Sequence, residues 1–183
     1  MSKKPQLFIP IASSSREGWI RANHADNIEE FEKLSKEIGY ALLAWSAVEV
    51  SLKFIWVAST KSSKSITVIK AWESLESFRT RLAVVDSAVK ASDISDQLLE
   101  DWDKLKERCR KKSLRRNLLA HGTAFYDHDE PNVSKKYFIS RLIFGKSFDT
   151  STKLHLNELE HLTLAFGALD HDLVEFWNAF RAA

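Results

Sequence analysis

The chain has few of the residues that interrupt or cross-link a fold. Its 183 residues include only 5 glycines, 3 prolines and 1 cysteine. Glycine and proline punctuate turns, so their scarcity favours long uninterrupted elements, above all helices. The single cysteine, Cys109, excludes a disulfide within the chain and fits a reducing compartment. We therefore expect a mostly helical domain that disulfides do not hold together.

A clear excess of either charge is also missing. The 27 basic and 25 acidic residues give a formal net charge of +2, so the overall charge says little about partners. Hydrophobic residues make up 44% of the chain and charged residues 28%, which is typical of a folded protein rather than a disordered one. The length suits one domain that buries a core of its own.

A long uncharged hydrophobic run is the third absence. The longest apolar stretch, residues 40–57, contains Glu49 and Lys53, and charges at the centre of a membrane span are costly. The first 15 residues, MSKKPQLFIPIASSS, begin with lysines, but their apolar run is short and broken by Pro10, which is a poor match to a signal peptide. We therefore expect a buried core helix, no membrane span and a cytoplasmic protein.

Helical periodicity covers most of the chain after residue 25. We expect a first helix over 26–59 (bent or divided at Gly39), a second over 65–91, a third from a cap at Ser92-Asp93 to His121, and a last one from 156 or 157 to 181. Residues 126–132 are typical of a loop. The runs 136–144 and 152–156 are rich in β-branched and aromatic residues and predict a hairpin.

These elements predict an all-α fold, a four- to five-helix up-down bundle with a small β-hairpin insertion before the last helix. Residues 1–24 contain two of the three prolines and are expected to form an irregular N-terminal arm. Residues 25–183 are expected to form a single helical domain.

The apolar seam of the third predicted helix turns polar before the helix ends. Three–four spacing leads along the helix through Leu98, Trp102, Leu105 and Cys109, and then through Ser113, Arg116 and Ala120. An arginine that faces a core is costly without an anion beside it. Glu49, on the apolar face of the first helix, is the best candidate for that anion.

The stretch RRNLLAHG, residues 115–122, places polar side chains at the end of this helix. Asn117 and His121 share a helix face, and Arg116 lies about 100° away from Asn117 around the axis. Histidine can move a proton near neutral pH, and arginine can hold a phosphate through two hydrogen bonds. This chemistry suits attack on a phosphodiester without a metal. A plain helix C-terminus explains the same letters, since basic residues and glycine are common there.

Positive charge is concentrated beside this motif. Between residues 104 and 116 eight basic residues stand against Glu107 alone, as in a protein that binds a phosphate backbone. Complementing the negative end of the helix dipole explains the cluster equally well. The predicted RNA contacts are Lys104, Arg108, Lys111, Lys112 and Arg115.

Arg-Asn-Leu-Leu-Ala-His, residues 116–121, resembles the signature of the HEPN superfamily. That signature is an arginine, often followed by a polar residue, and a histidine after four to six intervening residues. HEPN proteins are all-α bundles that commonly dimerise, and many are metal-independent endoribonucleases of toxin, defence and RNA-processing systems. The resemblance implies that Arg116 and His121 are catalytic, with Asn117 as the supporting polar residue and Glu49 as the acid. It also implies that the sites of two protomers face each other across a cleft.

On this basis we expect a metal-independent endoribonuclease of a toxin or defence system, with RNA as its substrate, no cofactor and a homodimeric assembly. The ribose 2′-hydroxyl would attack the neighbouring phosphodiester, with His121 as general acid or base and Arg116 as the phosphate clamp. Two alternatives stay open: a non-catalytic HEPN-type module that binds RNA or a protein, and a helical assembly protein in which the motif only ends a helix. An antitoxin or regulatory protein also stays open as a partner.

Two other features have simpler explanations. Asp127, His128, Asp129 and Glu130 are typical of a solvated loop as well as of a metal site. Cys109 lies on the core seam, so we expect a buried structural thiol rather than a nucleophile. We therefore predict no metal site and no nucleophilic cysteine.

Overall fold

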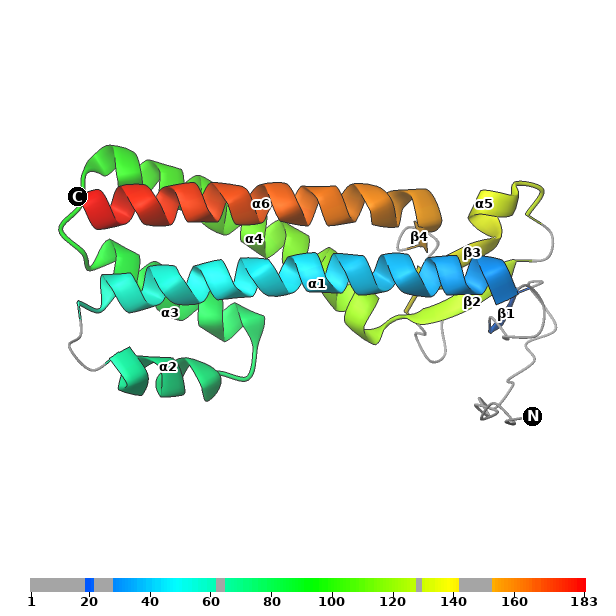
Figure 1. Cartoon of the computed structure of the whole chain (residues 1–183), viewed down its shortest axis with the longest axis horizontal. Coiled ribbons are helices and arrows are strands. Elements are labelled where there is room, and N and C mark those ends of the chain that lie inside the picture. The colour runs from blue at the N-terminus through cyan, green and yellow to red at the C-terminus, as the bar shows by residue number, and fades with distance from the viewer. Residues whose placement is uncertain (1–18, 22–27, 62–64, 128–129, 142–152) are drawn as a thin grey trace.

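In the computed structural model, the described parts of the chain are residues 19–21, 28–61, 65–127, 130–141 and 153–183. Three long helices dominate them: α1 (Ile28–Ser59), α4 (Asp96–His121) and α6 (Leu156–Ala182). The longer helices alternate in direction along the chain, so the bundle is of the up-down type, and α1 and α6 run side by side in the same direction (Figure 1). The predicted helical bundle with a β insertion is confirmed.

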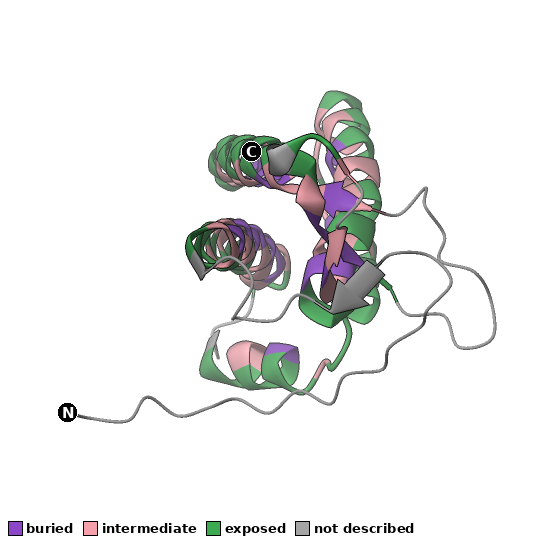
Figure 2. Ribbon diagram, turned by 90° about the vertical axis from the view of Figure 1, so that its right-hand side faces the viewer, coloured by how far each residue is buried: buried purple, intermediate pink, exposed green. Residues whose placement is uncertain are grey.

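The core lies where the helices face one another, as the stretches of ribbon coloured as buried in Figure 2 show. Most of its fully buried large side chains come from α1, α4 and α6, among them Trp45, Trp102 and Phe166, and the strand residues Phe138 and Ile139 add to them. Trp45 contacts Phe166 edge-on, with ring centroids 5.0 Å apart. α1 continues unbroken through Gly39, where an added Cβ would meet no atom within 4 Å. The first helix is therefore single and not divided.

The second predicted helix is in fact two: α2 (Ser65–Glu73) and α3 (Phe78–Lys90). Ser77 caps α3, since its side chain accepts a hydrogen bond from the Thr80 amide at 3.0 Å. The prediction of one helix over 65–91 was wrong because the apolar spacing runs through the break. Trp72 and Phe78 on either side of it are both buried.

The N-cap of α4 lies two residues after the predicted cap at Ser92-Asp93. Ser95, not Ser92-Asp93, is the N-cap and accepts a hydrogen bond from the Leu98 amide at 3.4 Å. The helix ends at His121 with Gly122 as its C-cap, as predicted. Gly122 has a φ of −77°, so glycine is not needed there for a left-handed backbone. It is needed for space, because a Cβ would collide with the side chain of Ile139 and the carbonyl of Leu118.

Four short strands follow one another across an antiparallel sheet beside the end of α4: β1 (Trp19–Arg21), β2 (Thr123–Asp127), β3 (Tyr137–Ser140) and β4 (Leu154–His155). Phe125 of β2 lies opposite Phe138 of β3, and Ile139 lies opposite Leu154 of β4. A single turn of helix, α5 (Val133–Lys136), connects β2 to β3. The sheet holds the end of α4 in place through β2, which starts directly after Gly122.

The predicted hairpin corresponds to β3 and β4, which are shorter than the runs 136–144 and 152–156; residues 142–152 lie outside the described residues. Two strands contradict the predictions. β2 includes Tyr126 and Asp127, which were assigned to a loop, and β1 lies in the arm that was expected to be irregular. Both strands depend on pairing with distant segments, a signal that local sequence does not contain.

α1 is long and apolar enough to cross a membrane by length and composition alone, and it is the one described helix that passes this test. A core helix of a soluble protein passes the same test. One side of α1 is buried against the rest of the bundle, with Ala41, Val48 and Leu52 inaccessible to solvent.

Candidate active site

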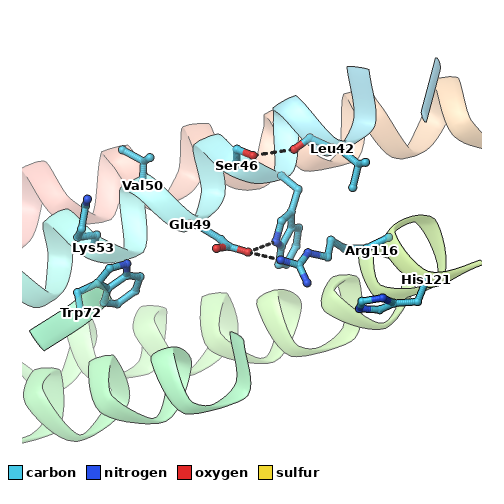
Figure 3. Close-up of a pocket in the computed structure, with 10 residues that line it drawn as sticks. Leu42, Ser46, Glu49, Val50, Lys53, Trp72, Arg116 and His121 are labelled. Atoms are coloured by element: carbon cyan, nitrogen blue, oxygen red, sulfur yellow. Dashed lines mark hydrogen bonds and ion pairs between the residues drawn. The ribbon is translucent and has the colours of Figure 1, made fainter. Parts of the chain in front are cut away.

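A pocket of about 440 Å³ opens between α1, α2 and the C-terminal end of α4 (Figure 3). It contains three of the four predicted catalytic residues, although Glu49 and Arg116 are 67 positions apart in the chain. The lining residues are Leu42, Trp45, Ser46, Glu49, Val50, Lys53, Trp72, Arg116, Ala120 and His121. The fold thus brings the HEPN-like motif and the acid of α1 to one concave surface.

Glu49 binds two arginines and a tryptophan. Its Oε1 accepts hydrogen bonds from Arg116 Nη2 at 2.9 Å and from Trp45 Nε1 at 2.7 Å, and its Oε2 accepts one from Arg81 Nη1 at 2.6 Å. The structure therefore contains the Glu49–Arg116 contact that the sequence predicted. Two guanidinium groups share one carboxylate, which leaves one positive charge in excess at the base of the pocket.

Arg81 was not predicted to belong to the site. It comes from α3, donates from Nε to the Leu75 carbonyl at 3.0 Å, and lies over the Trp72 ring at 5.5 Å from its centroid. These contacts hold the guanidinium against the second oxygen of Glu49. The sequence carried no clear signal for this role, because Arg81 lies at the edge of the apolar stripe of its helix, next to Leu82, where a charged residue is common.

His121 and Asn117 occupy different places. His121 is exposed, lines the pocket and makes no hydrogen bond to the part of the chain that the structure describes. Asn117 does not line the pocket; its Oδ1 accepts a hydrogen bond from Arg116 Nη1 at 3.1 Å. Asn117 therefore orients Arg116, while the imidazole of His121 is available to a ligand.

The basic residues of α4 form two groups. Most of them are paired with acids: Lys104 with Asp101, Lys106 with Asp86 and Asp103, Arg108 with Asp172, and Arg110 and Lys111 with Glu107. Lys112 and Arg115 make no ion pair with any described residue. Of the five predicted RNA contacts, these two keep an unopposed charge, and both lie near the motif.

The sequence count of acids around this cluster was incomplete. It included Glu107 alone, whereas Asp86 from α3 and Asp172 from α6 also reach the helix. The hydrogen bonds of Arg110 lower the pKa of Glu107 to about 2, so this carboxylate is ionised wherever the protein is folded near neutral pH. Fewer basic side chains of α4 are therefore left to bind a ligand than the sequence indicates.

Cys109 is buried in the core, as predicted, and burial raises the pKa of its thiol to about 12. A thiol with that pKa is not a nucleophile at neutral pH. Among the described residues no group of three or more His, Cys, Asp or Glu side chains could hold a metal ion. Two members of the predicted loop cluster, His128 and Asp129, lie outside the described residues.

Comparison of the chain with protein-family models, with curated proteins and with solved structures finds no match. The pocket is therefore the feature of the molecule that bears on function. Its cationic side chains can bind an anion, its histidine can transfer a proton, and its apolar walls can hold an uncharged ring.

Proposed function

We propose that this protein is a metal-independent endoribonuclease of the HEPN type, acting in a toxin or defence system. One observation carries the proposal: Arg116 and His121 line the same pocket, and Glu49 and Asn117 hold the guanidinium of Arg116. The histidine is exposed at the pocket while the arginine is held within it. A helix end without a catalytic role does not require that arrangement.

In the proposed reaction the ribose 2′-oxygen bonds to the neighbouring phosphorus and the bond to the 5′-oxygen breaks. The 2′-hydroxyl loses its proton and the leaving 5′-oxygen gains one. His121 carries out one of these two transfers and solvent water the other, and Arg116 stabilises the negative charge on the phosphate. The products are a 2′,3′-cyclic phosphate and a 5′-hydroxyl end. No metal or other cofactor takes part in this scheme.

Arg81 makes the phosphate contact of Arg116 less costly. A carboxylate left without a cation in a half-buried site is strongly unfavourable. Because Arg81 remains on Oε2 of Glu49 at 2.6 Å, Arg116 can turn toward a phosphate without leaving Glu49 unpaired. In this mechanism Glu49, Asn117 and Arg81 are positioning residues, and Arg116 and His121 contact the substrate.

We also propose that the protein works as a homodimer. α1 carries an exposed apolar stripe of Tyr40, Leu43, Val50 and Phe54, whose exposed fractions are 47%, 70%, 45% and 49%, with Ala47 at its centre. The spacing of three and four residues is that of a helix-pairing seam. From either end the order is aromatic, aliphatic, alanine, aliphatic, aromatic, so two antiparallel copies would pair aromatic with aromatic and aliphatic with aliphatic.

The dimer would bring two pockets near each other, because Val50 belongs to both the stripe and the pocket. The ion pairs of Glu49 in the middle of α1 favour a bundle in water over a bilayer. We therefore include a cytoplasmic location and no membrane in the proposal.

The deciding experiment is cleavage of cellular RNA in EDTA by wild type, His121→Ala and His161→Ala. His161 is an exposed histidine on α6, away from the pocket residues, and serves as the matched control. We expect wild type and the control to cut and leave cyclic-phosphate ends, and His121→Ala to be at least about 100-fold slower. Equal rates for all three proteins would contradict the proposal.

A second candidate is a non-catalytic HEPN-type module that binds RNA or a protein. Lys112 and Arg115, unopposed among the described residues, would serve such a module as well as an enzyme. Tight RNA binding without cleavage would favour the module, or an enzyme whose activity depends on an antitoxin or regulatory protein. Loss of RNA binding on neutralising Lys112 and Arg115, with indifference to His121→Ala, would then distinguish the module.

A further inference from the structure

Lys53 is the charged pocket residue that the proposed reaction does not use. It is half-buried, lines the pocket beside Trp72, and lies one helical turn after Glu49 on α1. Its ammonium group forms no ion pair or hydrogen bond with the described residues. Glu49, the acid of the pocket, is already bound by Arg81 and Arg116. The charge of Lys53 thus lies at the pocket with no described acid to neutralise it, so a ligand anion is the partner to look for.

The charged groups of the pocket are spread along its length. Figure 3 shows His121 at one end, Glu49 and Arg116 in the middle, and Lys53 with Trp72 at the other end. One turn of α1, about 5 Å, separates the attachment points of Glu49 and Lys53. Anions held by Arg116 and by Lys53 would thus be near neighbours, as successive phosphates of one strand are.

Apolar side chains accompany these two cation positions, with Trp72 beside Lys53 and Leu42 on the Arg116 side of the pocket (Figure 3). Leu42, Val50 and Trp72 give the pocket apolar walls. A nucleoside linked to two phosphates suits this pocket, because its uncharged rings can lie against the apolar walls while its phosphates face Arg116 and Lys53. The pocket volume of about 440 Å³ is in the range of sites that bind small organic groups.

We propose that Lys53 binds the phosphate adjacent to the scissile one, so that the pocket holds one nucleoside together with the phosphates on both of its sides. Arg116 contacts the scissile phosphate and Lys53 its neighbour. This inference rests on the proposed function in taking an RNA strand as the ligand. It concerns binding and does not require that the strand is cut.

The test uses a 2′-fluoro oligoribonucleotide, which keeps the phosphates of RNA but has no 2′-hydroxyl to attack them. Its dissociation constant is measured by fluorescence anisotropy at several salt concentrations. We expect Lys53→Gln to raise Kd roughly 5- to 10-fold and to reduce the salt slope by about 0.7, the value for one phosphate contact on a single strand. Lys53→Arg should restore most of the affinity, because it restores the charge.

The matched control is Lys33→Gln, which removes the same charge from an exposed position about 30 Å earlier on α1. It should leave Kd within about twofold of wild type and the salt slope unchanged. Melting temperatures of all variants check that each protein is folded. A set of oligonucleotides with one neutral methylphosphonate each locates the phosphate, since one position should weaken binding to wild type and not to Lys53→Gln.

The results separate this inference from the nuclease proposal. If wild type cuts RNA while Lys53→Gln and Lys33→Gln bind the oligonucleotide alike, Lys53 is not a phosphate ligand and the nuclease stands. If Lys53→Gln binds weakly but wild type cuts no RNA, the subsite stands and an enzyme that acts without a partner is excluded. If wild type does not bind the oligonucleotide, the inference is overturned; failure to cut RNA would then remove the enzyme as well.

Discussion

The two halves of α4 both carry basic residues, but only the first half also carries acids. Residues 96–108 include five acids, whereas residues 109–121 include none. In the first half, Trp102, Leu105 and Cys109 fill the core, and the basic side chains are paired with acids. In the last three turns Arg116 faces Glu49, while Lys112, Arg115 and His121 have no ion pair among the described residues. Basic residues on a helix thus become a binding surface only where the fold places no acid beside them.

Acids of α4 itself and of its neighbours account for the difference. Asp101, Asp103 and Glu107 pair with basic residues three or four positions later on the same helix. α3 supplies Asp86 to Lys106 at 3.1 Å, and α6 supplies Asp172 to Arg108 at 2.7 Å. The end of α4 lies beside α1, which offers the single acid Glu49 to the pocket. The first half of α4 therefore supports the fold, and the second half is available for a ligand.

The largest effect should come from the core of the first half. Trp102 is fully buried, donates to Asp86 at 3.0 Å and packs against Phe176. We expect Trp102→Ala to reduce the free energy of unfolding by about 3–5 kcal/mol in urea denaturation. Trp177→Ala, at a half-buried tryptophan of α6, is the control and should cost clearly less. Equal losses in the two variants would mean that the first half of α4 does not contribute more to the stability of the fold than the surface of α6 does.

The next largest effect should come from Glu49, which links the second half of α4 to α3 through Arg116 and Arg81. Glu49→Gln leaves Arg81 and Arg116 without an anion, although all three side chains keep some contact with solvent. We expect a loss of about 2 kcal/mol in the free energy of unfolding. Glu73→Gln, at an exposed acid of α2, should stay within about 0.5 kcal/mol of wild type. If Glu49→Gln leaves the free energy of unfolding unchanged, Arg81 and Arg116 need no anionic partner for stability.

A third experiment compares the two halves directly by RNA affinity. Lys112→Gln with Arg115→Gln removes two unopposed charges, and Lys104→Gln with Lys106→Gln removes two charges that acids already neutralise. We expect the first pair to raise Kd for the 2′-fluoro strand about tenfold and the second pair about twofold or less. Equal effects of the two double substitutions would show that the whole basic cluster, and not only its unpaired residues, binds RNA.

The smallest effect concerns the acid that neutralises the middle of α4. The pKa of Glu107 is about 2 in the folded protein, mainly through its hydrogen bonds from Arg110, against an ordinary value of 4.5. Because the folded pKa is the lower one, this contribution to stability is fully present above about pH 4.5 and is lost as the pH falls toward 2.

The pKa of Glu107 can be followed by NMR titration of its side-chain carbon. In Arg110→Gln it should move back toward 4.5, and in Lys104→Gln it should stay low. An unchanged titration in Arg110→Gln would show that the surrounding helix, rather than Arg110, stabilises the carboxylate.

The sequence predicted the helices whose apolar residues recur at helical spacing, and it predicted the charged residues that interrupt such an apolar face. α1 and α6 were placed within about two residues, and Glu49 and Arg116 were paired because each is a charge on an apolar face. Arg81 was missed because it lies at the edge of a stripe, where a charge is ordinary. The break before Phe78 was missed because core spacing continues across it.

β1 and β2 could not be predicted for a different reason. β2 is held between β1 and β3, so its structure depends on residues more than a hundred positions before it and about ten after it. Local propensity records neither partner. Only part of the pairing of the α4 charges has the same origin. Asp86 and Asp172 approach only in the folded chain, whereas the pairs of Asp101, Asp103 and Glu107 follow from spacings of three and four residues on α4.

Gly122 has a consequence for genetic screens. A Cβ at this position would strike Ile139 and the backbone of α4, so almost every codon change there should disturb the adjoining His121 as well. A selection that scores survival alone would mark the glycine and the histidine as equally intolerant. The two positions would be intolerant for different reasons, Gly122 because a larger side chain does not fit and His121 because of its proposed role in proton transfer. Only soluble, folded protein from each allele can tell the two apart.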